Sequence, residues 1–138
     1  MRVCLDTSVL VSAFATRGLC ADVLQLVLTE HQLVLGEQVL AELGRVLRKK
    51  LRVPEEVAAE AEGLLRREAV VVTDAPDLDL PTLDKGDLAV LAQAVAGEAA
   101  ILVTGDRDFS DVVEHPPVRI LTPRGFWEEL RGGSRGDP

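Results

Sequence analysis

The amino-acid sequence predicts an α/β domain with three layers (α/β/α), in which helices cover both faces of a central, mostly parallel sheet of four to five strands. Two features support this fold class. Short apolar runs alternate with segments of helical periodicity along the chain, in five rounds. The runs are mostly apolar and do not alternate strictly with polar residues, as expected of strands that are buried on both faces. Strands that alternate with helices in this way are typical of a parallel sheet.

The predicted strands are the apolar runs, and helices are predicted where apolar residues recur at helical spacing, as at Val39, Leu43 and Val46. Pro54 suits the first turn of a helix, because the amide hydrogen that it lacks would be unpaired there. The strands are expected at residues 2–5, 31–36, 69–72, 101–103 and 118–121, and the helices at 8–15, 19–29, 37–50, 54–67, 83–95 and 124–130, with a further short turn from Asp108.

The size and composition predict a single domain at residues 1–130, followed by a disordered tail at 131–138. With 138 residues the chain is long enough to bury a core, and its 47% hydrophobic content is unlike that of a disordered protein. Aromatic residues make up only 3%, which argues against base stacking on aromatic platforms. The net charge of −8 argues against non-specific binding of nucleic acid through the overall field. A local basic patch or a bound divalent cation stays compatible with this charge.

The two cysteines predict neither a zinc site nor a disulfide framework. Cys4 lies inside the first predicted strand, and its spacing to Cys20 matches no set of zinc ligands. The opening residues lack the apolar core of a secretory leader, and no apolar run is long enough to span a membrane. We therefore expect a cytoplasmic protein without a membrane partner.

Two predicted strands end at an aspartate. Asp6 follows the first strand and Asp106 follows the strand that begins at Ile101, and Asp108 is close enough to Asp106 to reach the same ligand. In open α/β sheets, ligands bind outside the carboxyl ends of the strands. Each aspartate can instead cap the helix that follows it, although Thr7 or Ser8 is also a suitable cap for the first helix.

Three further acids lie on predicted helices. Asp84 and Asp87 fall at the start of a helix, where the helix dipole favours carboxylates without any functional reason. Asp87 lies on the apolar face, four residues before Leu91. Glu42 borders the apolar stripe of its helix, where burial of an unpaired carboxylate is costly. We expect a positively charged group, such as a metal ion, beside Glu42.

Together these acids predict a divalent metal site. Carboxylates without histidine or cysteine form a hard oxygen site, which suits Mg²⁺ or Mn²⁺ and not Zn²⁺. Such a site, with one or two ions, can activate a water molecule and stabilise the charge on a phosphodiester during displacement. Aspartates at strand ends also occur in aspartyl-phosphate proteins, such as receivers and phosphatases. The phosphatase pattern has a second aspartate where this chain has Ser8, and the receiver pattern has an acceptor aspartate in mid-chain, which is lacking here.

Four motifs in order resemble a PIN domain, and most closely the small prokaryotic VapC-like toxins of toxin–antitoxin pairs. They are residues 3–10, 40–47, 84–92 and 103–109, and the closing segment 121–127 extends the resemblance over nearly the whole chain. The resemblance implies an Mg²⁺- or Mn²⁺-dependent endoribonuclease. It also implies a homodimer that a cognate antitoxin protein holds inactive.

The resemblance assigns roles to individual residues. The catalytic and metal-binding acids would be Asp6, Glu42, Asp87 and Asp106, with Asp108 as an accessory ligand and Asp84 as the second choice for the third acid. Ser8 and Thr104 match polar residues that orient a carboxylate or a metal-bound water, although capping or strand-end hydrogen bonding also explains them. The alternative function is a catalytically silent PIN-fold module that binds protein partners.

One dense basic stretch is the candidate surface for RNA phosphates. It consists of Arg45, Arg48, Lys49, Lys50 and Arg52, of which the first three are the tentative RNA contacts. Cations near the end of a helix are also favoured by the helix dipole, so a solvated helix end explains the same residues.

Overall fold

The computed structural model describes residues 1–80, 83–106, 109, 114–115 and 118–132, and it confirms the predicted fold class. All five predicted strands are present, together with a sixth of two residues. The strands are β1 (Arg2–Leu5), β2 (Gln32–Gly36), β3 (Ala69–Val72), β4 (Ile101–Val103), β5 (Glu114–His115) and β6 (Val118–Leu121). The helices are α1 (Thr7–Ala15), α2 (Leu19–Glu30), α3 (Glu37–Arg45), α4 (Glu55–Glu68), α5 (Lys85–Ala96) and α6 (Pro123–Trp127), with the π-helical turns η1 (Val46–Lys50) and η3 (Glu128–Gly132).

The strand order of the sheet is β3-β2-β1-β4-β6-β5. The first five strands in this order are parallel, and the short β5 pairs antiparallel with β6 at the edge. The chain builds the sheet from β1 to β3 in one direction and then returns to place β4 on the other side of β1. This reversal makes a topological switch point between the carboxyl ends of β1 and β4, where open α/β sheets bind ligands.

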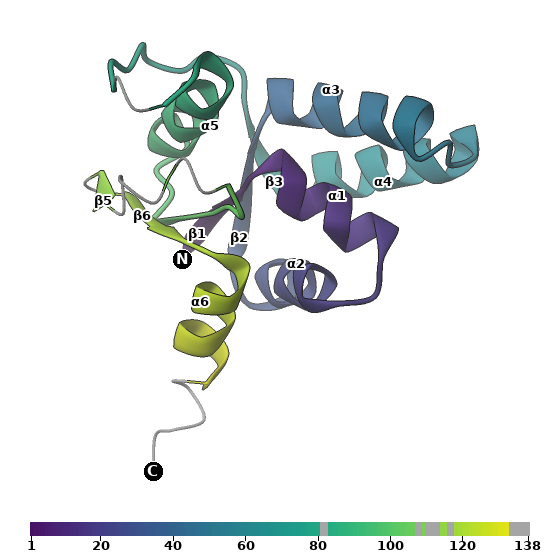
Figure 1. The fold of residues 1–138 in the computed structure, drawn as a ribbon, viewed down its shortest axis with the longest axis horizontal. Helices are drawn as coiled ribbons and strands as arrows, with labels where there is room; N and C mark the ends of the chain where they lie inside the picture. The colour runs from purple at the N-terminus through teal and green to yellow at the C-terminus, as the bar shows by residue number, and fades with distance from the viewer. Residues whose placement is uncertain (81–82, 107–108, 110–113, 116–117, 133–138) are drawn as a thin grey trace.

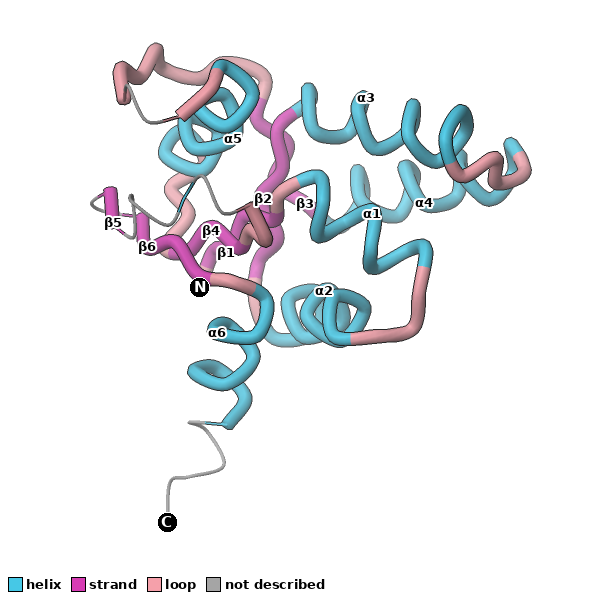
Figure 2. The backbone as a smooth tube through the Cα atoms, viewed as in Figure 1, coloured by secondary structure: helices cyan, strands magenta, loops and turns pink. Residues whose placement is uncertain are grey.

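Helices cover the sheet on both faces (Figures 1 and 2). Helices α1 to α4 lie on one side, and α5 covers the other. This division follows from right-handed crossovers, because the crossovers from β1 to β2 and from β2 to β3 run in the opposite direction to that from β3 to β4. Helix α5 is tightly docked, since a Cβ on Gly97 at its end would lie 2.3 Å from Cγ1 of Val34.

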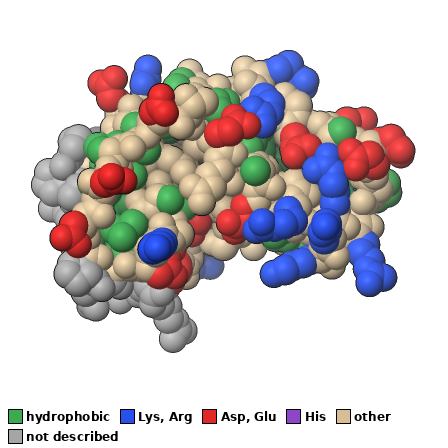
Figure 3. Space-filling model, turned by 90° about the horizontal axis from the view of Figure 1, so that it is seen from above, with side chains coloured by type: hydrophobic (Ala, Val, Ile, Leu, Met, Phe, Trp, Pro, Cys, Tyr) green, Lys and Arg blue, Asp and Glu red, His purple; other side chains and the backbone are tan. Residues whose placement is uncertain are grey.

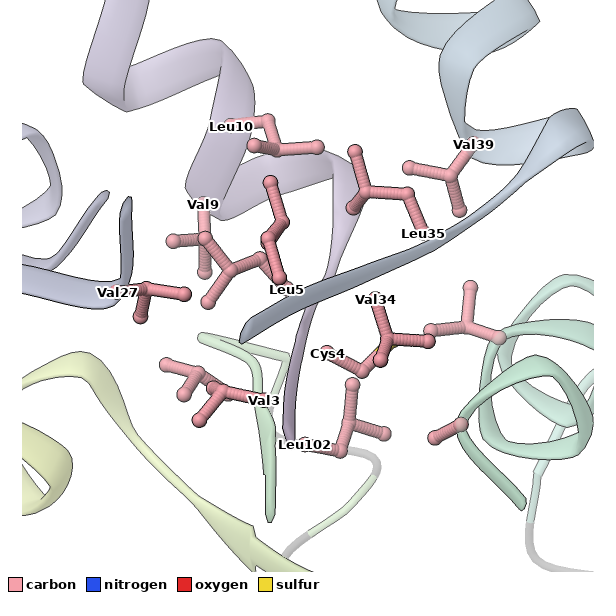
Figure 4. Packing of buried hydrophobic residues seen from close by; sticks show 14 of the residues in the cluster. Val3, Cys4, Leu5, Val9, Leu10, Val27, Val34, Leu35, Val39 and Leu102 are labelled. Carbon is pink, nitrogen blue, oxygen red and sulfur yellow. The ribbon is translucent and has the colours of Figure 1, made fainter. Parts of the chain in front are cut away.

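The core is built from aliphatic side chains on both faces of β1 (Figure 4). Val3 and Leu5 point to the α1 and α2 side, where Val9 and Val27 are also buried. Cys4 points to the α5 side and lies beside Val34 and Leu102, its partners in the register of the sheet. Burial, and secondarily the charge of Asp6, raises the pKa of the Cys4 thiol to about 12. Cys4 is therefore a buried apolar residue, as the sequence predicts.

The ends of several elements differ from the sequence prediction. The cap of α1 is Asp6 and not Thr7 or Ser8, because Oδ1 of Asp6 accepts a hydrogen bond from the Thr7 amide. The helix predicted at residues 37–50 changes from α-helical to π-helical geometry at Val46. At the C-terminal end, residues 131–132 complete η3, while the remainder of the predicted tail lies outside the described residues.

Among the described helices, none is by itself long and apolar enough to cross a membrane. Helices α1 and α2 pass this test only as a pair, by length and composition, and they meet at an angle of 106°.

Candidate active site

A pocket of about 460 Å³ lies at the switch point of the sheet, and four of the predicted acids line it. Asp6 follows β1 and Asp106 follows β4, so the parallel pairing of these strands brings the two carboxylates to the same edge. Glu42 reaches the pocket from α3, and Asp87 reaches it from the first turn of α5. The predicted acids therefore meet in one pocket although they come from four separate parts of the chain.

Asp6 is held in place by both of its carboxylate oxygens. Oδ1 accepts the hydrogen bond from the Thr7 amide at 2.6 Å, and Oδ2 accepts one from the Thr104 hydroxyl at 2.7 Å. The Ser8 hydroxyl donates a longer bond of 3.4 Å to Oδ2. Asp6 is thus both the cap of α1 and a member of the acidic pocket, so the two roles considered for it are compatible.

Thr104 connects the two strand-end aspartates. Its side chain is buried, and its hydroxyl oxygen accepts a hydrogen bond of 3.0 Å from the amide of Asp106 while its hydrogen is donated to Asp6. Thr104 thus makes the strand-end hydrogen bonds that were the alternative explanation for it, and through them it orients the carboxylate of Asp6. Ser8 is exposed and lines the same pocket, whereas Asp108 lies outside the described residues.

Asp87 is the most perturbed acid of the pocket. Burial is the main cause that raises its pKa to about 7, followed by the charges of Asp106 and Asp84, a hydrogen bond with Asp106 and the charge of Asp6. Its Oδ2 atom is buried and has no hydrogen-bond partner among the described residues. Near neutral pH the Asp87 carboxyl is therefore partly protonated, and a cation bound beside it would favour the ionised form.

Asp84 is the N-cap of α5 and not the third acid of the pocket. Its Oδ1 accepts a hydrogen bond of 2.8 Å from the amide of Asp87, which lies three residues later. Asp84 is exposed and is absent from the described lining of the pocket, although its charge contributes to the raised pKa of Asp87. The structure therefore selects Asp87 from the pair that the sequence left open.

The expectation that Glu42 is buried is wrong. Its side chain is 46% exposed and lies 4.0 Å from the guanidinium of Arg45, one turn further along α3. Glu42 borders the apolar stripe but points along the solvent side of it, so the cost of burial does not require a metal ion there. Its place in the pocket rests instead on α3, which begins directly after β2 and packs against α1, the helix that follows Asp6 (Figure 1).

Only part of the basic stretch is available to RNA phosphates. Both oxygens of Glu55 accept hydrogen bonds from Arg48, and Glu62 accepts a third at 2.7 Å. Arg48 therefore ties η1 to α4 and is a poor candidate for the predicted RNA contact. Arg45 and Lys49 are exposed, as are Lys50 and Arg52. Figure 3 shows basic side chains gathered at the end of the molecule where α3, η1 and α4 lie.

The donor chemistry of the pocket fits a divalent metal ion such as Mg²⁺ or Mn²⁺. The acids offer only carboxylate oxygens, and Oδ2 of Asp87 is a buried acceptor without a partner in the described structure. As the side chains stand, no three Asp, Glu, His or Cys residues in the described part of the chain form a group that could hold an ion. The carboxylates would therefore have to rotate toward a cation to bind it.

Sequence reasoning missed several residues of the pocket. Among them, Ser12, Cys20 and Pro123 line it from α1, α2 and α6. Ser12 lies four residues after Ser8, so helical spacing on the same face of α1 could have identified it. Cys20 and Pro123 gave no such signal, because they reach the pocket only through the packing of α2 and α6.

Comparison with known proteins agrees with this fold. The chain matches the family model described as PIN domain over residues 2–108. It resembles the solved structure of VapBC2 from Rickettsia felis bound to a DNA fragment from its promoter, with 18% identity over 88% of this chain and 98% of that chain and a TM-score of 0.63. It also resembles VapBC-1 from nontypeable Haemophilus influenzae, with 18% identity over 90% of this chain and 99% of that chain and a TM-score of 0.63.

No curated protein matches the chain. At 18% identity the two solved structures establish a shared fold and nothing about activity. The family match establishes membership, because it spans most of the chain. The matched part includes β1, α3, α5 and the residues that follow β4. This protein therefore belongs to the PIN domain family.

Proposed function

We propose that this protein is a metal-dependent endoribonuclease and the toxin of a toxin–antitoxin pair. The observation that carries the proposal is the acidic pocket, in which Asp6, Glu42, Asp87 and Asp106 meet at the switch point of the sheet. Membership of the PIN domain family supports a nuclease, and the likeness to two VapBC structures supports the toxin role.

The residues of the pocket would have two roles, metal binding and the positioning of a metal ligand. Asp6, Asp87 and Asp106, with Glu42, would hold one or two Mg²⁺ or Mn²⁺ ions. A cation bound there supplies a water of lowered pKa and stabilises negative charge on the phosphodiester. Thr104 would keep Asp6 oriented through its hydrogen bond, and Asp87 would give up its proton as the cation binds, since a nearby positive charge favours the ionised carboxylate.

Two exposed cations on α3 and η1 support an RNA strand that crosses the pocket toward α3. The chain carries a net charge of −8, so its overall field repels nucleic acid. Arg45 and Lys49 are exposed beyond the pocket along α3 and η1, where they can contact phosphates next to the cleaved bond. A bound cation and these two side chains would together offset the local repulsion.

An apolar groove supports a protein partner, which we propose is a cognate antitoxin. The groove measures about 710 Å³ and lies between α1 and α4, where Phe14, Val57 and Leu64 line it. Val57 is 51% exposed beside Phe14 and Leu64, and contiguous apolar surface of this kind marks sites of protein interaction. We also propose that the protein is cytoplasmic and forms a homodimer. Light scattering on the purified protein would test the dimer.

The nuclease proposal is tested with purified protein, free of antitoxin, and labelled single-stranded RNA in Mg²⁺, Mn²⁺ or EDTA. We expect cleavage in either metal, none in EDTA, and little in the variants Asp6→Asn and Asp106→Asn. Asp74→Asn, in the exposed loop after β3, is the matched control and should cleave as the wild type does.

A second readout does not depend on activity. Mn²⁺ should raise the melting temperature of the wild type and of Asp74→Asn, but not that of Asp106→Asn, because ligands that bind only the folded state stabilise it. Wild-type protein that binds Mn²⁺ without cutting RNA would favour the silent binding module. Cleavage that persists in EDTA would overturn the role of the metal.

A further inference from the structure

A second pocket lies between the start of α3, the end of β3 with the loop after it, and α5. It measures about 260 Å³, and its polar lining includes Gln38, Thr73, Asp77 and Gln93. None of the described residues that line it is a Lys or Arg, whereas Glu37 and Asp77 are acids. The pocket therefore disfavours a phosphate and suits an uncharged polar group that can donate hydrogen bonds. We call it the glutamine pocket.

Gln93 is a buried amide with an unused acceptor. The residue is 7% exposed, and its Oε1 has no hydrogen-bond partner within the described structure. Its Nε2 donates a long bond of 3.4 Å to Oε1 of Gln38. Burial of a polar atom without a partner is unfavourable, so the amide of Gln93 has hydrogen-bonding capacity that the described residues do not fill.

The amide of Gln93 packs directly against the backbone of Gly36, which has no side chain. Gly36, at the end of β2, lies so close that a Cβ there would be 1.7 Å from Oε1 of Gln93. Any larger residue at this position would push the side chain of Gln93 away from the sheet. The glutamine pocket thus depends on a glycine and an amide that fit one another.

The glutamine pocket lies beside the acidic pocket along α3. Gln38 lines the former and Glu42 lines the latter, and Arg45 lies 4.0 Å from Glu42. These residues stand at positions i, i+4 and i+7, which share one face of a helix. At 1.5 Å of rise per residue, Gln38 and Glu42 are separated by about 6 Å along the helix axis. A nucleotide next to the one cleaved can span this distance.

We propose that the glutamine pocket binds a nucleobase next to the cleaved phosphodiester and so determines where RNA is cut. This inference rests on the proposed ribonuclease activity. Glutamine amides recognise base edges by paired hydrogen bonds, and bases in single strands are read on their exposed edges. The side-chain carbonyl of Gln38 and the carboxylate of Asp77 are acceptors in the lining, and they favour a base with an amino group. Adenine, cytosine and guanine carry one, and uracil does not.

Binding is tested by NMR on the wild type in Ca²⁺, a hard cation that carboxylate oxygens bind, so that the acidic pocket does not repel the RNA. The oligonucleotides are checked for cleavage after each spectrum. The probes are short oligoribonucleotides of adenine, cytosine or uracil alone, and the signals are the side-chain amides of the four glutamines. Gln38 and Gln93 should shift with adenine or cytosine and shift less with uracil. Gln25 on α2 and Gln32 on β2 are internal controls and should not respond.

The same spectra separate failure of the glutamine pocket from failure of the proposed function. Shifts at the backbone amides of Ser8 and Gly105, without shifts at Gln38 and Gln93, would overturn the base site and leave RNA binding at the acidic pocket intact. Spectra that show no response to any oligonucleotide would count against both proposals. Equal shifts for all three bases would overturn the preference for an amino group.

Cleavage of single-stranded RNA of random sequence provides the second arm, because the ends of the products show which bases flank the cut. In Mn²⁺, Gln38→Leu and Gln93→Met should lower the preference for an amino base over uracil by roughly tenfold, the size of a good base contact. Gln25→Leu, an exposed glutamine away from both pockets, is the matched control. An unchanged preference in the exposed variant Gln38→Leu would overturn the proposal even if Gln93→Met fails to fold.

Discussion

The hydroxyl of Thr104 donates a hydrogen bond of 2.7 Å to Oδ2 of Asp6, which lies 98 positions earlier in the chain. The same hydroxyl oxygen accepts the amide hydrogen of Asp106 at 3.0 Å. Through these two bonds, a side chain at the end of β4 orients the carboxylate at the end of β1 and fixes the turn that carries Asp106. The spatial relation of the two strand-end acids therefore depends on a residue that is not itself acidic.

Replacement of Thr104 by valine keeps the shape of the side chain and removes both hydrogen bonds. We expect the free energy of unfolding to fall by about 1 to 3 kcal/mol, because Asp6 loses a buried donor to a charged group. Urea denaturation measures this loss. Thr29→Val, at an exposed site on α2, should change stability by less than about 0.5 kcal/mol. Equal stability of Thr104→Val and wild type would show that the bond does not hold the site together.

The raised pKa of Asp87 predicts a pH-dependent stability in the absence of divalent metal. The carboxyl ionises at its ordinary value of 3.8 in the unfolded chain and near pH 7 in the folded protein. Between these values the folded state binds more protons, so the free energy of unfolding falls as the pH rises from about 4 to 7. The extra proton that the folded state binds at Asp87 stabilises it fully below pH 3.8, the pKa of the unfolded chain. This stabilisation is lost as the pH rises through the pKa of about 7 in the folded protein.

Asp87→Asn should remove this loss, because the amide carries no charge at any of these pH values. In EDTA at pH 8 we expect the variant to be more stable than the wild type, by on the order of 1 to 3 kcal/mol, and the gain should shrink at pH 5. Denaturation curves at both pH values measure the difference. Asp74→Asn, in an exposed loop, should follow the wild type. A gain of the same size at pH 5 and pH 8 would contradict the assignment.

Arg45 and Arg48 should respond differently to replacement by glutamine, although they are three residues apart. Arg45 is exposed near Glu42, so Arg45→Gln should weaken RNA binding and lower the slope of log affinity against log salt by about 0.7. Arg48 is engaged with Glu55 and Glu62, so Arg48→Gln should leave the slope unchanged and lower the melting temperature, most clearly at low salt. Fluorescence anisotropy and thermal melts separate the two. Equal slopes for both variants would refute the distinction.

Gly97 is a packing constraint between α5 and the sheet. A Cβ at this position would lie 2.3 Å from Val34 and 3.1 Å from Val72, and a short branched side chain cannot move aside as the end of a long flexible one can. We expect Gly97→Ala to lower stability by about 1 to 3 kcal/mol. Gly63→Ala, in the interior of α4, meets only the flexible end of Arg67 and should raise stability by about 0.5 to 1 kcal/mol. Urea midpoints that move in the same direction for both variants would contradict this explanation.

The predictable part of the site was the part set by local pattern. Asp6 and Asp106 follow apolar strands directly, and a parallel sheet places such residues at one edge whatever the rest of the chain does. Spacing alone could place Asp87 on the apolar face of its helix. The choice between Asp87 and Asp84 as the third acid required the structure, which shows Asp84 as the cap of the helix. Glu42 was placed correctly in the pocket for a wrong reason, because spacing locates a residue at the border of a stripe without showing which side it faces.

The sequence alone determined the class of the fold, the order of its elements and the two aspartates that follow strands. These follow from hydrophobic periodicity and from the chemistry of single residues, which are local properties of the chain. Three contacts were visible only in the tertiary structure. They are the hydrogen bond of Thr104 with Asp6, the ion pairs of Arg48 with two glutamates on α4, and the packing of Gln93 against Gly36. Each of these joins residues from separate elements, and their distances depend on how helices dock on the sheet, which no local pattern records.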